Sequence, residues 1–316
     1  VKNADVVIEN FAPGLMEKLN LDYPVLRETN PRIIMARLKG FGLDGPYRDY
    51  KCFEMIAQAA GGVMAGNGFP DKEPVRLGAG IGDTGTGIHA AAAILAAYIQ
   101  RQRTGRGQLV ECSMQEVITN FLRIRYMDHY RAEAPATRLG NELVGSVPSG
   151  VYPCAPGGPN DYVYIYSQPN IPKMWDDLVR AIGRPDLIDD PRCVDAATRY
   201  ENRQELNPII SDWTRQRDKH EVMRILGEAG IPCSGVFDTA DVLNDPHLNA
   251  RGQIVDVEHA VRGKLKMPGC PVRLSESPAV QAPVPLLGEH TADILAEVLG
   301  KSADDVETLR GRGVVR

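Results

Sequence analysis

Residues 4–40 read ADVVIENFAPGLMEKLNLDYPVLRETNPRIIMARLKG, and this stretch decides the fold. Two short apolar segments, 6–8 and 33–35, are typical of buried strands. Between them, residues 15–28 carry spaced leucines that indicate a helix. A strand, a helix and a strand at this spacing predict a βαβ unit of a parallel sheet. Because a parallel sheet rarely begins with such an edge strand, we expect further βα units upstream of residue 1.

The chain after residue 40 continues the α/β pattern. Helices are expected at 53–60, 84–102 and 114–130, with a strand at 108–112. A long loop rich in glycine and proline, 66–83, precedes the second of these helices. Loops of this length inside a compact domain are usually functional, so the loop and the helix after it are the first place to look for a site.

A shift in composition indicates a domain boundary. Residues 131–161 contain several prolines and glycines and no long periodic segment. We therefore expect a large domain at 1–138, a linker and small domain at 139–255, and a C-terminal segment at 256–316. The small domain is predicted to be mixed α+β, because the strand YVYIY (162–166) is followed by helical patterns.

The composition excludes several classes of protein. Hydrophobic residues make up 43% of the 316 and charged residues 24%, which is ordinary for a globular chain. The formal net charge of −5 argues against nucleic acid as a partner. The longest apolar run, 90–99, is too short to span a bilayer, so no membrane attachment is expected. The six scattered cysteines predict reduced thiols in a cytoplasmic protein, with neither a zinc site nor a disulfide framework.

Asp83 is the strongest candidate for a catalytic residue. It follows a glycine-rich run and stands at the expected start of a helix. Unpaired N–H groups and a partial positive charge at that end keep a carboxylate ionised. The glycines allow a ligand to approach the backbone closely, and such a carboxylate can act as a nucleophile. The plain alternative is an N-cap without further function, and both interpretations stay open on local features.

The same residues also match a dinucleotide-binding pattern. Residues 80–85 read GIGDTG, which has the form G-x-G-x-x-G before a helix. That signature requires a buried strand directly before it, whereas residues 71–79 contain a proline and several charges. A nicotinamide-dependent oxidoreductase is therefore a weak alternative. The sequence also lacks the short motifs of zinc proteases, P-loop proteins and serine hydrolases.

Other charged residues read as surface features. Glu54 follows Lys51 by three residues and is interpreted as half of a solvated charge pair on a helix. Lys18 lies on the first predicted helix, on an exposed face. His290 opens the last predicted helix, where capping is the expected role. None of these residues would be assigned a function from its local pattern alone.

Six segments together resemble the class III CoA-transferases, the superfamily of formyl-CoA:oxalate CoA-transferase and α-methylacyl-CoA racemase. The resemblance implies a Rossmann-like large domain, a smaller α+β domain, a C-terminal segment that returns to the large domain, and two chains interlocked as a homodimer. The segments follow the family's order: ENFAPGLMEKL (9–19), PYRDYKCFEMIAQAAGG (46–62), GDTGTGIHAA (82–91), TGRGQLVECSMQE (104–116), GIPCSGV (230–236) and PLLGEHTADIL (285–295).

The resemblance also implies an activity, the transfer of CoA from an acyl-CoA donor to a small carboxylic acid. The family's nucleophile falls on Asp83, which would attack the donor thioester and form a covalent aspartyl intermediate. The glycine amides at 82–87 would then stabilise the developing oxyanions. CoA enters as a substrate, and neither a permanently bound cofactor nor a metal is implied.

Binding residues follow from the same resemblance. The family's CoA-binding positions fall on Asn10, Phe11, Ala12, Lys18, Tyr50, Lys51, Cys52 and Phe53. Its substrate-pocket positions fall on Glu54, Met114, Gly145 and Ser146. The last two come from the stretch that matches the lid of the oxalate-specific enzymes. That lid's glycine-rich pattern is not retained here, which disfavours oxalate as the acceptor.

Two related functions stay open beside CoA transfer. An acyl-CoA racemase of the same superfamily places a histidine near the position of Cys52 or Phe53, and the sequence has none there. Two-base proton exchange would then lack its second base. A truncated, non-catalytic homologue would lack the nucleotide-binding units that we expect upstream of residue 1. The sequence therefore predicts CoA transfer ahead of these alternatives.

Overall fold

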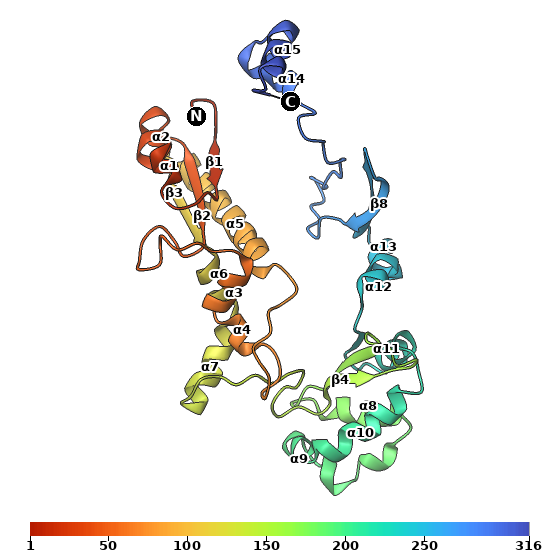
Figure 1. Cartoon of the computed structure of the whole chain (residues 1–316). Coiled ribbons are helices and arrows are strands. Elements are labelled where there is room, and N and C mark those ends of the chain that lie inside the picture. The colour runs from red at the N-terminus through yellow and green to blue at the C-terminus, as the bar shows by residue number, and fades with distance from the viewer. Residues whose placement is uncertain (316) are drawn as a thin grey trace. The chain divides into compact units, whose positions relative to one another are not determined.

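The computed structural model describes residues 1–315 and divides into two compact units. The first unit is Val1–Gly150, and the second begins at Val151 (Figure 1). One sheet lies in the first unit; a second begins at Ser149 and continues into the second unit, and a third lies wholly in the second unit. The expected three-part division at 138 and 255, and the return of segment 256–316 to the large domain, stay predictions.

A parallel sheet forms the centre of the first unit, as residues 4–40 predicted. Its strands lie in the order β1-β2-β3 and both neighbouring pairs are parallel. Val6 pairs with Ile34, and Met35 pairs with Leu109. The strands are β1 Val6–Glu9, β2 Ile34–Lys39 and β3 Leu109–Ser113.

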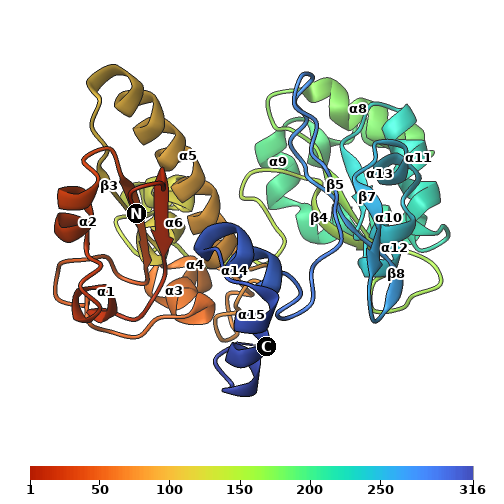
Figure 2. The same ribbon diagram turned by 90° about the horizontal axis from the view of Figure 1, so that it is seen from above.

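Helices cover both faces of this sheet (Figure 2). Met35 packs with Met16 and Leu26 on one face, where α1 and α2 lie. The neighbouring β2 residue, Ile34, packs on the other face with Ala97 of α5. This alternation is the period of two that a strand imposes on its side chains. The covering helices are α1 Leu15–Lys18, α2 Tyr23–Thr29 and α5 Ile81–Thr104.

The prediction of one helix over 15–28 was wrong, since the segment forms the two helices α1 and α2. Asn20, between them, has a φ of 56°, in the left-handed region that interrupts a right-handed helix. Pro24 lies in the first turn of α2. Proline has no N–H to donate and is disfavoured inside a helix, but it is tolerated in the first turn.

The helix that carries Asp83 begins earlier than expected, at Ile81. Its glycines explain how closely it packs. A Cβ on Gly85 would stand 2.8 Å from the Phe121 ring, and one on Gly82 would stand 3.0 Å from Glu54 Oε2. At these two positions glycine serves contacts between helices, which corrects the expectation that it serves the approach of a ligand.

Four further helices complete the first unit. The expected helix at 114–130 is broken at Leu122, which stands between α6 and α7. Ser113 caps α6 by accepting a hydrogen bond from the Glu116 N–H. Residues 71–79 form neither helix nor strand, so the dinucleotide pattern lacks the strand that it requires. The helices are α3 Glu54–Ala60, α4 Val63–Gly66, α6 Met114–Phe121 and α7 Arg123–Ala132.

The second unit contains a second sheet, in the order β4-β5-β6. Its strand β5 coincides with the predicted YVYIY segment and pairs antiparallel with β6. Val163 and Ile165 of β5 are fully buried, as is Leu178 of α8. The elements are β4 Ser149–Pro153, β5 Tyr162–Tyr166, α8 Pro172–Ala181, η1 Pro185–Leu187, η2 Pro191–Cys193, α9 Ala196–Glu201, α10 Arg203–Thr214, α11 Lys219–Glu228 and β6 Cys233–Gly235.

The rest of the chain forms a hairpin and short helices. Asp238 and Asp241 make a capping box at the start of α12. The strands β7 and β8 pair antiparallel, and His290 precedes α14 without a side-chain cap bond. The elements are α12 Thr239–Asn244, α13 Pro246–Ala250, β7 Ile254–His259, β8 Gly263–Pro268, α14 Thr291–Leu299 and α15 Ala303–Gly311. Within residues 1–315, none of the helices is both long and apolar enough to cross a bilayer.

Candidate active site

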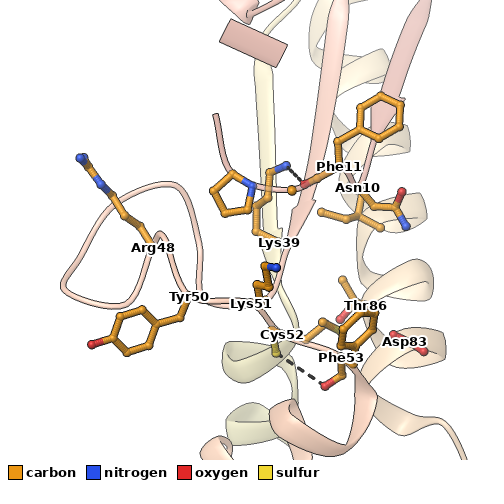
Figure 3. A pocket seen from close by; sticks show the side chains of 15 residues that line it. Asn10, Phe11, Lys39, Arg48, Tyr50, Lys51, Cys52, Phe53, Asp83 and Thr86 are labelled. Atoms are coloured by element: carbon orange, nitrogen blue, oxygen red, sulfur yellow. Dashed lines mark hydrogen bonds between the residues drawn. The ribbon is translucent and has the colours of Figure 1, made fainter. Parts of the chain in front are cut away.

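A cavity of about 600 Å³ opens in the first unit, where β1 and β2 end (Figure 3). Ligands bind open parallel sheets at the carboxyl ends of the strands, so the fold itself places a site here. The walls come from the segment after β1, the end of β2, the loop before α3, the first two turns of α5 and the start of α6. The lining residues are Asn10, Phe11, Ala12, Pro13, Leu38, Lys39, Gly40, Arg48, Tyr50, Lys51, Cys52, Phe53, Asp83, Thr86 and Met114.

Most of the predicted site residues meet in this cavity, but four do not line it. Lys18 lies on α1 with its side chain exposed, and Glu54 lies behind the wall, against the start of α5. Gly145 and Ser146 precede β4, so their place in the substrate pocket stays a prediction.

Sequence reasoning missed several residues of the cavity wall. Thr86 lies one helical turn after Asp83, so the spacing of three residues was an available signal. The end of β2, residues 38–40, could have been inferred from the rule that parallel strands present their carboxyl ends to ligands. Nothing in the local pattern singled out Pro13 or Arg48.

The Asp83 side chain is free within the described part of the chain. It makes no hydrogen bond and no ion pair there, and it is exposed. The N-cap position of α5 is Gly80, without a side-chain cap bond, so the interpretation of Asp83 as an N-cap is wrong. Its carboxylate lies in the first turn of the helix, where the dipole favours negative charge. Asp83 thus presents an available carboxylate to the cavity.

Glu54 binds the backbone at the start of the Asp83 helix. Its Oε2 accepts a 2.6 Å hydrogen bond from the Asp83 N–H, and its Oε1 accepts a 3.0 Å bond from the Gly82 N–H. The Gln58 side chain donates to the same Oε1 at 2.8 Å. The expected pairing of Glu54 with Lys51 was therefore wrong, because the carboxylate is used to cap α5.

This arrangement also changes the expected source of oxyanion stabilisation. The N–H groups of Gly82 and Asp83 are bound to Glu54, and those of Ile81 and Thr84 are bound to backbone carbonyls. The first turn of α5 thus has no free donor to offer. The expectation that the Gly82 amide stabilises an oxyanion does not hold for this arrangement.

The ionisation of Glu54 follows from its surroundings. Burial raises the pKa of Glu54, but the hydrogen bonds from Gln58 and from the N–H groups of Asp83 and Gly82 lower it more strongly. The net pKa lies below its ordinary value, so the group is ionised at neutral pH.

The neighbouring thiol is held neutral. Burial raises the pKa of Cys52, and the charges of Asp83 and Glu54 raise it further. Because the thiolate is the reactive form of cysteine, Cys52 is a poor nucleophile at neutral pH. Within the cavity lining, the carboxylate of Asp83 is the better nucleophile.

Positively charged side chains and exposed aromatic rings lie at the same cavity. Lys51 makes no ion pair within residues 1–315, and Arg48 forms an exposed ion pair with its neighbour Asp49, at 3.3 Å. Tyr50 and Phe53 are 59% and 69% exposed, and the Tyr50 ring lies 5.3 Å from the Tyr47 ring. Ammonium and guanidinium groups suit phosphates, and exposed rings suit a base or an apolar chain.

Comparison with protein families gives one match over most of the chain. A family model described as "CoA-transferase family III" matches residues 1–291. A formyl-CoA:oxalate CoA-transferase from Streptomyces avermitilis is 40% identical over 328 residues, which cover 100% of this chain and 79% of that protein. A protein of the same name from Streptomyces coelicolor is 38% identical, with the same coverage.

Solved structures give a consistent fold. A CAIB/BAIF family protein from Brucella suis superimposes with a TM-score of 0.82 at 30% identity, covering 94% of this chain and 76% of that one. Rv3272 from M. tuberculosis gives a TM-score of 0.76 at 27% identity, covering 92% and 77%.

Proposed function

We propose that this chain, which belongs to CoA-transferase family III, moves CoA from an acyl-CoA donor to a carboxylic acid through a covalent intermediate on Asp83. Membership makes the chain a class III CoA-transferase. The observation that carries the mechanism is the free carboxylate of Asp83 in the cavity wall, next to a neutral Cys52 and near Glu54, whose carboxylate is bound to the start of α5.

The proposed reaction begins with attack on the donor. A carboxylate oxygen of Asp83 forms a bond to the thioester carbonyl carbon as the C–S bond breaks, giving a mixed anhydride and CoA thiolate. The thiolate then attacks the Asp83 carbonyl carbon and releases the donor acid. Asp83 is left as an aspartyl-CoA thioester.

The second half repeats the chemistry with the acceptor. The acceptor carboxylate attacks the aspartyl thioester and expels CoA thiolate, which then attacks the acceptor carbonyl of the new anhydride. The acyl group leaves on CoA and Asp83 returns as a carboxylate. Because every intermediate is an activated acyl group, one difficult exchange becomes several easier ones.

The choice of substrates is the finer part of the proposal. Formyl-CoA and oxalate are the first pair to test, because they are named in relatives that are 35–40% identical. The lid stretch before Pro148 predicts that other acids replace oxalate. A panel of small carboxylic acids with formyl-CoA as donor decides between the two.

The proposed enzyme uses CoA as a substrate and acts as an interlocked homodimer in the cytoplasm. Ile88, Leu95 and Ile99 follow one face of α5 and are 65%, 64% and 55% exposed. An apolar helix face of this kind supports the packing of a partner chain against α5. The free cysteines support a reducing compartment. Light scattering of the purified chain should give twice 34.6 kDa, and a monomer mass would overturn the dimer.

An adduct trap tests the mechanism. The chain is incubated with acyl-CoA esters and no acceptor, then treated with hydroxylamine, which attacks the Asp83 acyl group and displaces CoA. Peptide mass spectrometry should find a hydroxamate at Asp83. Transfer activity without this adduct, or an adduct on another residue, would overturn the proposal. Asp293→Asn is the matched control variant, because Asp293 also lies in the first turn of a helix. It leaves Asp83 in place, so the hydroxamate at Asp83 should still form.

Racemisation has less support at this cavity. No histidine is among its lining residues, so the cavity offers no imidazole as the second base of a proton exchange. Incorporation of solvent deuterium at the α-carbon of a branched acyl-CoA, in the absence of an acceptor, would favour the racemase instead.

A further inference from the structure

The cavity wall formed by residues 10–13 rests on a buried group of charges. We call Glu9, Glu17, Arg37 and Lys39 the Glu9 cluster. Arg37 Nε lies 2.6 Å from Glu9 Oε1, and Lys39 Nζ lies 2.7 Å from Glu9 Oε2. Arg37 also reaches Glu17 of α1 at 2.7 Å. The cluster contains two charges of each sign, and Glu9, Arg37 and Lys39 are all buried.

The sheet explains why these residues meet. Glu9 and Arg37 are register partners on the adjacent strands β1 and β2. Arg37 and Lys39 alternate with Leu38 along β2, so they share the face of Met35, which α1 and α2 cover. At the ends of the strands the face changes from apolar to charged, beside the cavity.

The same cluster binds both backbone polar groups of one residue in the cavity wall, Phe11. The Phe11 N–H donates to Glu9 Oε2 at 2.9 Å. The Lys39 ammonium donates to the Phe11 carbonyl at 2.7 Å, the bond drawn as a dashed line in Figure 3. The Phe11 ring itself stays half exposed at the cavity. The backbone is therefore fixed while the ring is left available.

A gain in folding stability does not by itself explain this buried cluster of charges. Taking charges out of water is costly, and well-packed apolar residues in place of a buried ion pair are often equally or more stable. A cluster that fixes the backbone of a binding wall has a different use, because a wall held in one conformation loses little entropy when it receives a ligand.

We propose that Lys39 is a positioning residue for CoA esters, which acts through Glu9 and the Phe11 carbonyl to hold residues 10–13 in their binding conformation. The inference rests on the proposed function, since it takes this cavity as the CoA site. In this role Lys39 acts as a fixed support, and its ammonium is already used by Glu9 and Phe11.

Substitution of Glu9 separates this role from direct attraction of phosphate by Lys39. If Lys39 acts through the wall, Glu9→Gln loosens the wall and weakens CoA binding. If Lys39 instead attracts the phosphates directly, removing the negative charge of Glu9 strengthens binding. The two roles thus predict changes of opposite sign in the dissociation constant.

The experiment is calorimetric titration of the full chain with CoA, together with thermal unfolding. Lys39→Met and Glu9→Gln should each raise Kd roughly tenfold or more, the scale expected when a binding group is displaced from its productive position. Arg101→Met is the matched control. Arg101 is also a buried cation of this unit, paired with Asp5 before the start of β1. Its loss should lower Tm and leave Kd unchanged.

A second variant covers the case in which Lys39→Met fails to fold. Glu9→Gln combined with Lys39→Met removes one charge of each sign, so the net charge of the cluster is unchanged and Arg37 keeps Glu17 as its partner. This double variant should recover Tm and keep a raised Kd. Recovery of both quantities, or tighter binding by Glu9→Gln, would overturn the inference.

The result also separates this inference from the proposed function. A wild-type chain that forms the Asp83 hydroxamate and shows no change of Kd in either single variant overturns only the role of Lys39. A wild-type chain that neither binds CoA nor forms the adduct overturns both.

Discussion

The backbone N–H of Asp83 donates a 2.6 Å hydrogen bond to the carboxylate of Glu54. The two acidic residues therefore have different tasks. Glu54 is fixed by backbone amides and by Gln58, whereas the side chain of Asp83 has no partner in the described chain. One carboxylate fixes the start of α5, and the other is left free at the cavity that α5 lines.

Glu54→Gln should weaken the start of α5. The amide side chain lacks the negative charge and one of the two acceptor oxygens that now bind Gly82 and Asp83. A hydrogen bond to a charged group is worth about 1.5–3 kcal/mol, so we expect a loss of unfolding free energy on that order. Urea unfolding measures this loss. Transfer assays should show a lower kcat with little change in the Kd for CoA, and an unchanged kcat would contradict the role.

The stability supplied by Glu54 should depend on pH. Its pKa lies below the ordinary value of 4.5, so its contribution is fully present above the unfolded pKa and is lost as pH falls through the folded pKa. The difference in unfolding free energy between wild type and Glu54→Gln should stay constant from neutral pH downward and shrink below about 4.5. Urea unfolding at pH values on both sides of 4.5 checks this. A difference that grows in acid would exclude the assigned hydrogen bonds.

Asp83→Asn should abolish transfer without disturbing the fold. Removing a catalytic nucleophile costs activity by roughly 10⁴-fold or more. Because the Asp83 side chain is exposed and unpaired, its loss should change the unfolding free energy by no more than about 0.5 kcal/mol. Steady-state assays and urea unfolding measure the two effects on one preparation. Retained turnover would remove Asp83 from the mechanism.

The sequence predicted the parallel sheet well because its signal is local and strong. Ile34 and Met35 lie in a short apolar strand that any fold of this class must bury. The same reasoning failed at the 15–28 helix, where Asn20 adopts a left-handed conformation that depends on how α1 and α2 meet the sheet.

The candidate site was also predicted only in part from the sequence. Asp83 could be named from its glycine-rich motif, and its neighbours in the cavity came from a family resemblance. The role of Glu54 could not be predicted, because its partners Gly82 and Asp83 are 28 and 29 residues away in sequence. Only the packing of α3 against α5 brings the carboxylate to those amides.

Lys51→Ala should weaken the binding of CoA esters. Lys51 lines the cavity and makes no ion pair within residues 1–315, so its charge is available to a phosphate. We expect Kd to rise by up to about tenfold, equivalent to about 1.4 kcal/mol. The effect should shrink at high ionic strength, because salt screens exposed charges. Calorimetric titration at two salt concentrations tests both points, with the exposed Lys2→Ala as control; an equal effect in both variants would contradict a local role.

Two glycines of α5 offer a test of how closely the helix packs. A Cβ on Gly85 would lie 2.8 Å from the Phe121 ring, whereas one on Gly87 would meet nothing within 4 Å. Gly85→Ala should therefore destabilise the unit by about 1–3 kcal/mol through overpacking. Gly87→Ala, in the same helix and with the same chemical change, should stabilise it by up to about 1 kcal/mol, because alanine is the better helix former. Urea unfolding of the two variants compares them directly. Equal effects would mean that Phe121 moves away freely and that Gly85 is not required for the contact between α5 and α6.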